Sequence, residues 1–368
     1  ILWSSDRSIG SPTTKLWVNG TEVTSWATNN EYSQDDTGAA NQNYDTWIGG
    51  ENSSGARLGA YIAEMVWLDG TFVSDATGFG EYDSDSPTIW KPIDVSGLTF
   101  GTNGWYFDFK DSSNLGNDAN GGTDFSETGI AATDQATDVP TNNFCTMNPL
   151  DNFYVAATFS QGNNSVVIAS GIKTYATGTM GVSSGKWYWE CELDAHSGSS
   201  ANDQAIGIAD RVSTSASTDS YAASYPANFI YQTDGNFKES GTTNTTSSAP
   251  DSLTDGDIIG VALDLDNNKL YFSKNGTWQD SGNPESGATG TGAMTVIAPS
   301  HADTSGFYFP IVGSDTTSKG ATWLFNFGGS PAFTVSSGNA DGNGYGNFEY
   351  AVPANYYSIN TKNLAEYG

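Results

Sequence analysis

"DIIGVALDLDNNKLYFSKNGTW", residues 257–278, decides the fold class. Apolar side chains alternate with small or polar ones on both sides of a central turn at residues 266–268. Alternation with a period of two buries one face of a strand, and a short polar break between two such runs predicts an antiparallel pair. Asn275-Gly276 then suits a type I′ turn, which needs positive φ at both central positions. The stretch predicts a β-meander with these residues facing inward: Ile259, Val261, Leu263, Leu265, Leu270 and Phe272.

Two further stretches repeat this pattern. "GKWYWECELD", residues 185–194, predicts a half-buried strand with Trp187, Trp189, Cys191 and Leu193 on the inner face and Tyr188, Glu190, Glu192 and Asp194 on the outer one. "KLWVNGTEV", residues 15–23, repeats the Asn-Gly hairpin signal and, like residues 275–277, also spells a glycosylation acceptor. The turn alone explains both Asn-Gly pairs. No stretch shows helical periodicity, so we predict an all-β chain.

Composition narrows the class of partner. The chain has 13 basic and 42 acidic residues among 368, a net charge of −29, which repels phosphate backbones and acidic membrane surfaces. We therefore expect no nucleic-acid partner and, without an apolar run of about 18 residues, no membrane insertion. Cys145 and Cys191 match no zinc site, and whether they pair stays open.

The chain divides into four segments by amino-acid composition and by how clearly strands can be predicted. Residues 1–72 hold the first hairpin, residues 73–152 form a turn-rich connector with one strand near 104–109, residues 153–335 hold the clearest strands, and residues 336–368 form a C-terminal extension. Only 14 residues precede the first hairpin, too few to cover a sandwich face. We expect the first domain to be incomplete, its first strands lying upstream or coming from a neighbouring subunit.

Five ordered motifs between residues 153 and 335 resemble the successive strands of SPRY domains: "GKWYWECEL", "IGIAD", "LTDGDIIGVALDLDNNKLYFSKNG", "FYFPIVG" and "TWLFNFGG". The motifs "KLWVNGTEV", "WIGG" and "GAYIAEMVWLDG" resemble the second half of a laminin-G-like (concanavalin A-like) domain. The resemblance implies two antiparallel β-sandwiches of jelly-roll type, the first incomplete, joined by an irregular connector.

The connector adds a second resemblance. "FGEYDSDSPTIWKPIDVSGLTFGTNGWYFDFKDSS" and "ATDQATDVPTNNFCTMNPLD" resemble a linker of large structural proteins of tailed bacteriophages, especially marine ones, and "VPANYYSINTKNLAEYG" resembles a segment that leads into a further module. This similarity implies a non-enzymatic virion fibre, appendage or capsid decoration at the particle surface, and we expect it to be a homo-oligomer. Its implied partners are other virion proteins or a host surface glycan or receptor. A secreted bacterial adhesin that binds glycans is the alternative.

A polysaccharide hydrolase is the third hypothesis. Concanavalin-like glucanases resemble one another in an E-x-D-x-x-E strand motif, whose carboxyl groups must lie about 5–5.5 Å apart for retaining chemistry. "ECELDAHSG" departs from this motif because Ser197 stands where the third carboxylate belongs. Glu190 fits the SPRY motif instead, and the two histidines, His196 and His301, accompany no nucleophile motif. We therefore predict no catalytic residue and no cofactor.

Binding residues are predicted from composition alone. The acidic stretches 111–124 and 264–268 are candidates for calcium, although both lack the spacing of a twelve-residue calcium loop and Asx-turns explain most of their aspartates. Aromatic side chains beside polar loops are candidates for binding glycan or protein, with packing as the alternative for each. These aromatics are Tyr221, Tyr225, Trp278, Trp26 and Trp47.

Overall fold

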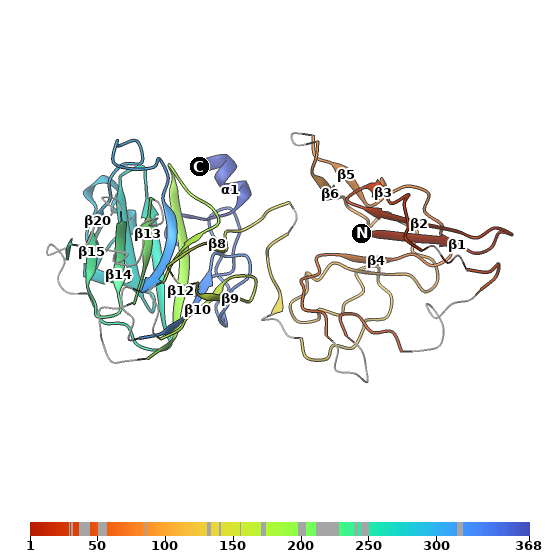
Figure 1. The fold of residues 1–368 in the computed structure, drawn as a ribbon, viewed down its shortest axis with the longest axis horizontal. Coiled ribbons are helices and arrows are strands. Elements are labelled where there is room, and N and C mark those ends of the chain that lie inside the picture. Colours follow the sequence, from red (N-terminus) through yellow and green to blue (C-terminus); the bar gives the residue numbers. More distant parts are fainter. Residues whose placement is uncertain are drawn as a thin grey trace. The chain divides into compact units, whose positions relative to one another are not determined.

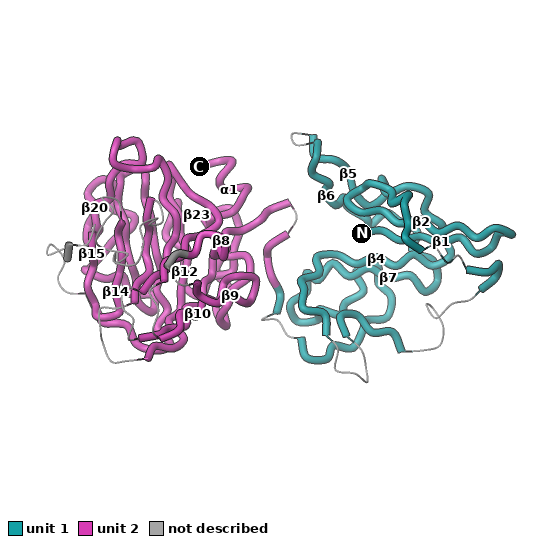
Figure 2. The backbone as a smooth tube through the Cα atoms, viewed as in Figure 1, with its two compact units in different colours: residues 1–135 teal, residues 136–368 magenta. Residues whose placement is uncertain are grey.

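The computed structural model describes the chain with short gaps and divides it into two compact units, residues 1–135 and 136–368 (Figure 2). The described residues are 1–28, 30, 32–36, 45–50, 57–84, 87–130, 134–139, 141–154, 156–170, 174–197, 204–210, 228–239, 242–243, 250–314 and 319–368. The unit boundary lies inside the predicted connector, so that residues 73–135 cluster with the first unit and residues 136–152 with the second. The fold is nearly all β, as predicted.

The second unit is built on two large antiparallel sheets (Figure 1). The seven-stranded sheet has the order β16 (Thr242–Thr243), β15 (Phe237–Glu239), β14 (Asn228–Gln232), β13 (Gln204–Ala209), β21 (Phe309–Ser314), β11 (Thr174–Gly178) and β8 (Met147–Tyr154). The nine-stranded sheet has the order β19 (Thr277–Trp278), β18 (Lys269–Lys274), β17 (Asp257–Asp264), β12 (Lys186–His196), β22 (Ala321–Asn326), β10 (Ser165–Ile168) and β9 (Thr158–Ser160), with β20 (Met294–Thr295) beside β18 and β23 (Tyr357–Ser358) beside β12. Two 3-10 segments, Gln279–Ser281 and Pro284–Thr289, follow β19.

The alternating residues of both sheets form one hydrophobic core. Trp187, Trp189 and Cys191 of β12 are at most 1% exposed and pack with Val261 of β17 and Trp323 of β22. The inner faces predicted for residues 185–194 and 257–272 are therefore confirmed. Period-two alternation succeeds here because both flanking sheets contribute apolar side chains to the same layer.

The outer face of β12 is different from the prediction. Tyr188 and Glu190 are 1% and 0% exposed, because the C-terminal extension lies over them. Phe348 packs edge-to-face against Tyr188 at 5.2 Å between ring centroids, and β23 pairs in parallel with β12. The prediction of a half-buried strand is therefore wrong at Tyr188 and Glu190, where the outer face is buried as well. The reason is a third layer that no local pattern in β12 encodes.

That third layer ends in a helix and is fixed by a buried polar network. α1 (Thr361–Tyr367) begins after Asn360, whose side chain accepts from the Asn363 N–H and so caps the helix. Asp341 accepts hydrogen bonds from Ser358 and from the Asn363 side-chain amide, at 2.7–2.9 Å. Cys145 N–H donates to the Ile359 carbonyl, so the extension is also joined to the start of the unit. Residues 336–368 are thus an integral part of the second unit.

The two Asn-Gly turns have the same geometry. Asn19 and Gly20 have φ of 49° and 74°, and Asn275 and Gly276 have φ of 49° and 78°, as the predicted type I′ turns require. In both turns an aromatic ring packs on the glycine. A Cβ at Gly20 would overlap the Trp90 ring, and one at Gly276 would lie 2.6 Å from Cδ1 of Tyr350. Each turn therefore requires glycine for two reasons, the positive φ and the close contact with an aromatic ring.

We expect Gly276→Ala to destabilise the chain more than Gly344→Ala does, although both substitutions place an alanine at positive φ. Gly344 is the matched control, because it has φ of 79° and open space around its Cα. Positive φ costs an alanine about 1–2 kcal/mol at either site. Displacement of the Tyr350 ring adds to this cost only at Gly276. Urea denaturation of both variants tests the difference, and equal losses would show that the ring contact contributes nothing.

The first unit has smaller sheets. β1 (Leu2–Asp6), β2 (Thr13–Val18) and β3 (Thr21–Glu22) form one, β4 (Met65–Trp67) pairs with β7 (Trp105–Phe107), and β5 (Gly80–Tyr82) pairs with β6 (Trp90–Pro92). Val95, Phe100 and Tyr106 form one buried hydrophobic cluster in it. β7 lies within the predicted 104–109 strand. The laminin-G-like assignment of residues 1–72 stays a prediction. No helix among the described residues is long and apolar enough to span a membrane.

Candidate functional site

The aromatic candidates have different surroundings. Tyr221 and Tyr225 lie outside the described residues. Trp26 and Trp47, both in the first unit, are 40% and 48% exposed. Trp278 is half-buried, and its ring packs edge-on against Tyr271 with 6.5 Å between centroids. Exposure therefore leaves Trp26 and Trp47 accessible to a ligand, whereas Trp278 has a packing partner.

Glu190 is a structural carboxylate. Its Oε1 accepts from the Tyr188 hydroxyl at 2.9 Å and the Tyr350 N–H at 2.8 Å, and its Oε2 accepts from the Glu349 N–H at 2.9 Å and the Asn326 amide at 3.2 Å. Burial raises the pKa of Glu190 to about 7, and these four donors oppose that rise. The carboxylate holds the C-terminal extension to the sheet.

The predicted row of carboxylates on β12 is interrupted. The register between β12 and β22 shifts between Leu193 and Ala195, which makes Asp194 the extra residue of a β-bulge. After the bulge Ala195 is opposite Thr322, and His196 is opposite Ala321. Regular period-two spacing, on which the hydrolase hypothesis depended, therefore ends at Asp194.

In both calcium candidates, a buried aspartate already accepts hydrogen bonds from backbone N–H groups. Asp118 is 4% exposed and accepts from the N–H groups of Tyr106, Asn120 and Gly122. Asp264 forms an ion pair with Lys186 at 3.0 Å and accepts from Asn267. In the described parts of the chain no three His, Cys, Asp or Glu side chains are grouped to hold a metal ion. The Asx-turn interpretation accounts for these aspartates.

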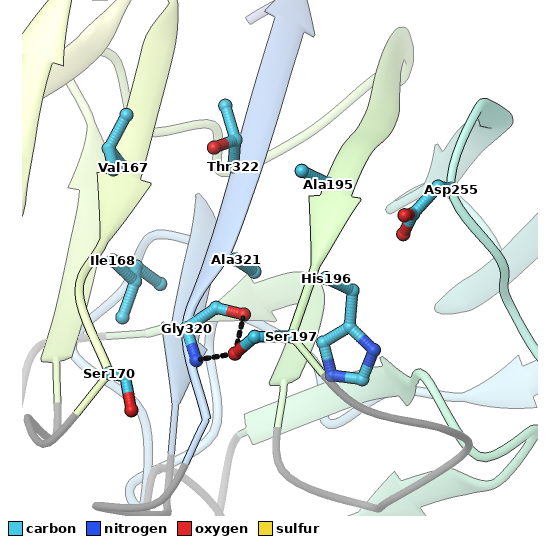
Figure 3. Close-up of a pocket in the computed structure, with 10 residues that line it drawn as sticks. All are labelled: Val167, Ile168, Ser170, Ala195, His196, Ser197, Asp255, Gly320, Ala321 and Thr322. Atoms are coloured by element: carbon cyan, nitrogen blue, oxygen red, sulfur yellow. Dashed lines mark hydrogen bonds between the residues drawn. The ribbon is translucent and has the colours of Figure 1, made fainter.

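A shallow groove of about 370 Å³ lies where β10, β22 and β12 run side by side (Figure 3). Val167, Thr322 and Ala195 are opposite one another across the three strands, and Figure 3 shows them in a row. His196 and Asp255 lie at one side of the groove. No local sequence pattern predicts the groove, because its strands β10 and β22 are far apart in the sequence. The bulge at Asp194 leaves no signal in the sequence.

Hydrogen bonds fix the lower end of the groove. The Ser197 hydroxyl accepts from the Gly320 N–H at 2.7 Å and donates to the Gly320 carbonyl at 3.2 Å (Figure 3). The Ser197 N–H donates to the same carbonyl at 2.9 Å. The Gly256 N–H donates to the Leu193 carbonyl at 2.7 Å, which holds the turn of Asp255 beside the bulge. His301, the other histidine, is exposed and lies 3.4 Å from Asp303. Only His196 of the two therefore belongs to the groove.

Three carboxylates lie on β12 or line the groove beside it. Asp255 is a lining residue, and Glu192 and Asp194 precede the lining residue Ala195 on β12. We call these three carboxylates the acidic rim. Burial, and then the negative charge of Asp194, raise the pKa of Glu192 above its usual value. The groove thus combines a small apolar floor with an acidic rim.

Comparison with known proteins covers two of the three strands of the groove, β12 and β22, but not β10. The family model described as the SPRY domain matches residues 186–329. No curated protein matches the chain. Three solved structures are similar to about half of it: the SPRY domain of human HERC1 (19% identity, TM-score 0.37, covering 49% of this chain and 96% of that one), stonustoxin (16%, 0.32, 50% and 27%) and the TRIM65 PSpry domain (11%, 0.34, 50% and 89%). The matched residues run from the start of β12 through the end of β22. Residues 186–329 of this chain form a SPRY domain.

Proposed function

We propose that the chain is a structural, non-enzymatic component of a bacteriophage particle, a tail fibre, appendage or capsid decoration, whose SPRY domain docks onto another virion protein. Two sequence features support the assignment to a virion: the order of the laminin-G-like and SPRY-like motifs, and the resemblance of the connector to a linker of tailed-bacteriophage structural proteins. The groove supports docking. Val167 is 39% exposed there, although the neighbouring part of the same sheet face is sealed by the C-terminal extension.

The chemistry of the buried carboxylates also favours a binding role over a hydrolytic one. Glu190 is 0% exposed and engaged by four donors, so that a substrate would have to displace the C-terminal extension to reach it. Glycosidases need two accessible carboxyl groups across the scissile bond. Docking needs only a surface of complementary shape and charge, which the groove offers.

Adhesion to a host surface glycan is the second candidate, whether the chain belongs to a virion or to a secreted bacterial adhesin. The exposed indoles of Trp26 and Trp47 favour it, because a flat apolar ring can stack on a sugar. A glycan array probed with the full chain tests this role. Hits that Trp26→Ala and Trp47→Ala abolish would support adhesion, and an array without hits would leave docking.

We expect Val167→Arg to reduce the amount of chain retained in assembled particles at least about tenfold, the ratio that corresponds to 1.4 kcal/mol of lost binding. The arginine would fill the groove and replace its exposed apolar contact. Val139→Arg is the matched control, since Val139 is 40% exposed in the same unit. Quantitative mass spectrometry of purified particles measures retention. Equal retention of both variants would contradict docking through the groove.

A further inference from the structure

We propose that the groove formed by Val167, Ala195, Thr322, His196 and Asp255 binds a cationic segment of the partner, an Arg or Lys side chain beside a small apolar one. This proposal rests on the docking function above and specifies the chemistry of the partner.

The floor of the groove selects for small apolar groups. Val167 is opposite Thr322, and Thr322 is opposite Ala195, so that three short side chains lie in line across three strands (Figure 3). A cavity of about 370 Å³ over such a floor has room for one or two side chains of a peptide. Val167 keeps 39% of its surface in contact with solvent, and a partner would remove this apolar surface from water.

The rim supplies unbalanced negative charge. Within the described residues, the carboxylates of Glu192, Asp194 and Asp255 make no hydrogen bond or ion pair. Acidic residues nearby on the same sheet are paired instead: Asp257 with Lys274 and Asp264 with Lys186, both at 3.0 Å. Charge complementarity therefore favours a cation at the rim.

The alternatives to a cationic side chain fit less well. An anionic group would meet both the rim and a chain of net charge −29. A metal ion needs a grouped set of ligands, and in the described residues no such set of three exists. A peptide with adjacent arginine and valine residues fits the groove better. Its guanidinium can reach the negatively charged rim, and its valine can cover the exposed side chain of Val167.

Methyl NMR of the full chain with labelled Val and Ile tests the proposal. The probes are the peptide acetyl-Val-Arg-Val-amide, its counterpart acetyl-Val-Glu-Val-amide and calcium chloride. We expect the arginine peptide to shift the methyl signals of Val167 and Ile168 saturably, and the glutamate peptide to bind at least about tenfold more weakly. Three exposed ion pairs of about 0.5 kcal/mol each amount to that factor.

Neutralising the rim tests the contribution of its charge, and an equal change of charge in the first unit is the matched control. Glu192→Gln, Asp194→Asn and Asp255→Asn combined should weaken binding of the arginine peptide about tenfold, and 0.5 M NaCl should weaken it in the unaltered chain. The combination Asp35→Asn, Asp36→Asn and Asp45→Asn changes the net charge equally in the first unit and should leave binding unchanged. Equal binding of both peptides, no effect of the rim substitutions, or shifts produced by calcium alone would overturn the proposal.

The two proposals can fail separately. If Val167→Arg lowers retention in particles while the arginine peptide fails to bind, docking through the groove stands and the cationic partner is wrong. If the arginine peptide binds as expected while Val167→Arg is retained like Val139→Arg, the groove binds cations but does not dock the chain.

Discussion

Deletion of residues 336–368 is expected to unfold the second unit or to leave it soluble only as a partly folded species. The extension buries Phe348, Tyr356 and Ile359, each 0% exposed, and covers Tyr188 and Tyr271. Full burial of one large apolar side chain contributes about 1.5–3 kcal/mol. Three such side chains approach the total stability of an ordinary domain, about 5–15 kcal/mol. The SPRY family match ends at residue 329, so this loss would show that the folded module is longer than the match.

Point substitutions separate the packing of the extension from the effect of truncation. Phe348→Ala should destabilise the chain by about 3–5 kcal/mol, the usual loss for a buried phenylalanine. Phe307→Ala is the control, because Phe307 is 49% exposed in the same unit, and it should cost less than about 1 kcal/mol. Chemical denaturation followed by tryptophan fluorescence measures both. A truncated chain with an unchanged unfolding midpoint would refute the structural role of the extension.

Glu190→Gln is expected to destabilise the chain by about 2 kcal/mol at pH 5, and by less at pH 8. All four partners of Glu190 are donors, so that the amide NH₂ of a glutamine would oppose one backbone N–H in either orientation. A protonated carboxyl group still fits, because the Tyr188 hydroxyl can turn to accept its proton. The wild-type advantage is therefore greatest where Glu190 is neutral.

The pH dependence follows from the raised pKa of Glu190, about 7 in the folded chain against 4.5 for an ordinary glutamate. Between these values the folded state binds more protons than the unfolded state, so the contribution of Glu190 to stability is present below pH 4.5 and is lost as the pH rises through 7. Glu190→Gln removes this slope. Denaturation midpoints at pH 5 and pH 8 measure it, with Glu366→Gln as control because Glu366 is exposed in the same unit. Parallel pH profiles for wild type and Glu190→Gln would contradict the assignment.

Much of the SPRY domain can be predicted from local sequence. The alternation in β17 and β18 and the Asn275-Gly276 turn lead directly to the observed meander. Ile259 of β17 pairs with Lys274 of β18, and Lys274 pairs with Thr277 of β19 across the Asn275-Gly276 turn. Cys191 is a buried core residue, as its phase with Trp189 indicates. Such features depend on residues one or two positions apart, whose side-chain directions the strand geometry sets.

The candidate site could not be predicted in the same way. Its floor joins Val167, Ala195 and Thr322, which no spacing rule connects, and its shape depends on the register shift at Asp194. The aromatic residues that composition singled out lie elsewhere, apart from Tyr221 and Tyr225, which are outside the described residues. A groove on a sheet arises from strand order and register, and both are decided by contacts distant along the chain.

The sequence by itself determined the all-β class, the inner faces of β12, β17 and β18, and the two type I′ turns, because period-two alternation and positive φ are local properties. Only the tertiary structure decided which outer face meets solvent. Glu190 and Val167 both lie on outer faces of one sheet, yet the first is sealed by residues about 160 positions away and the second is 39% exposed. Burial is a property of what packs on a strand, and the strand's own residues do not encode it.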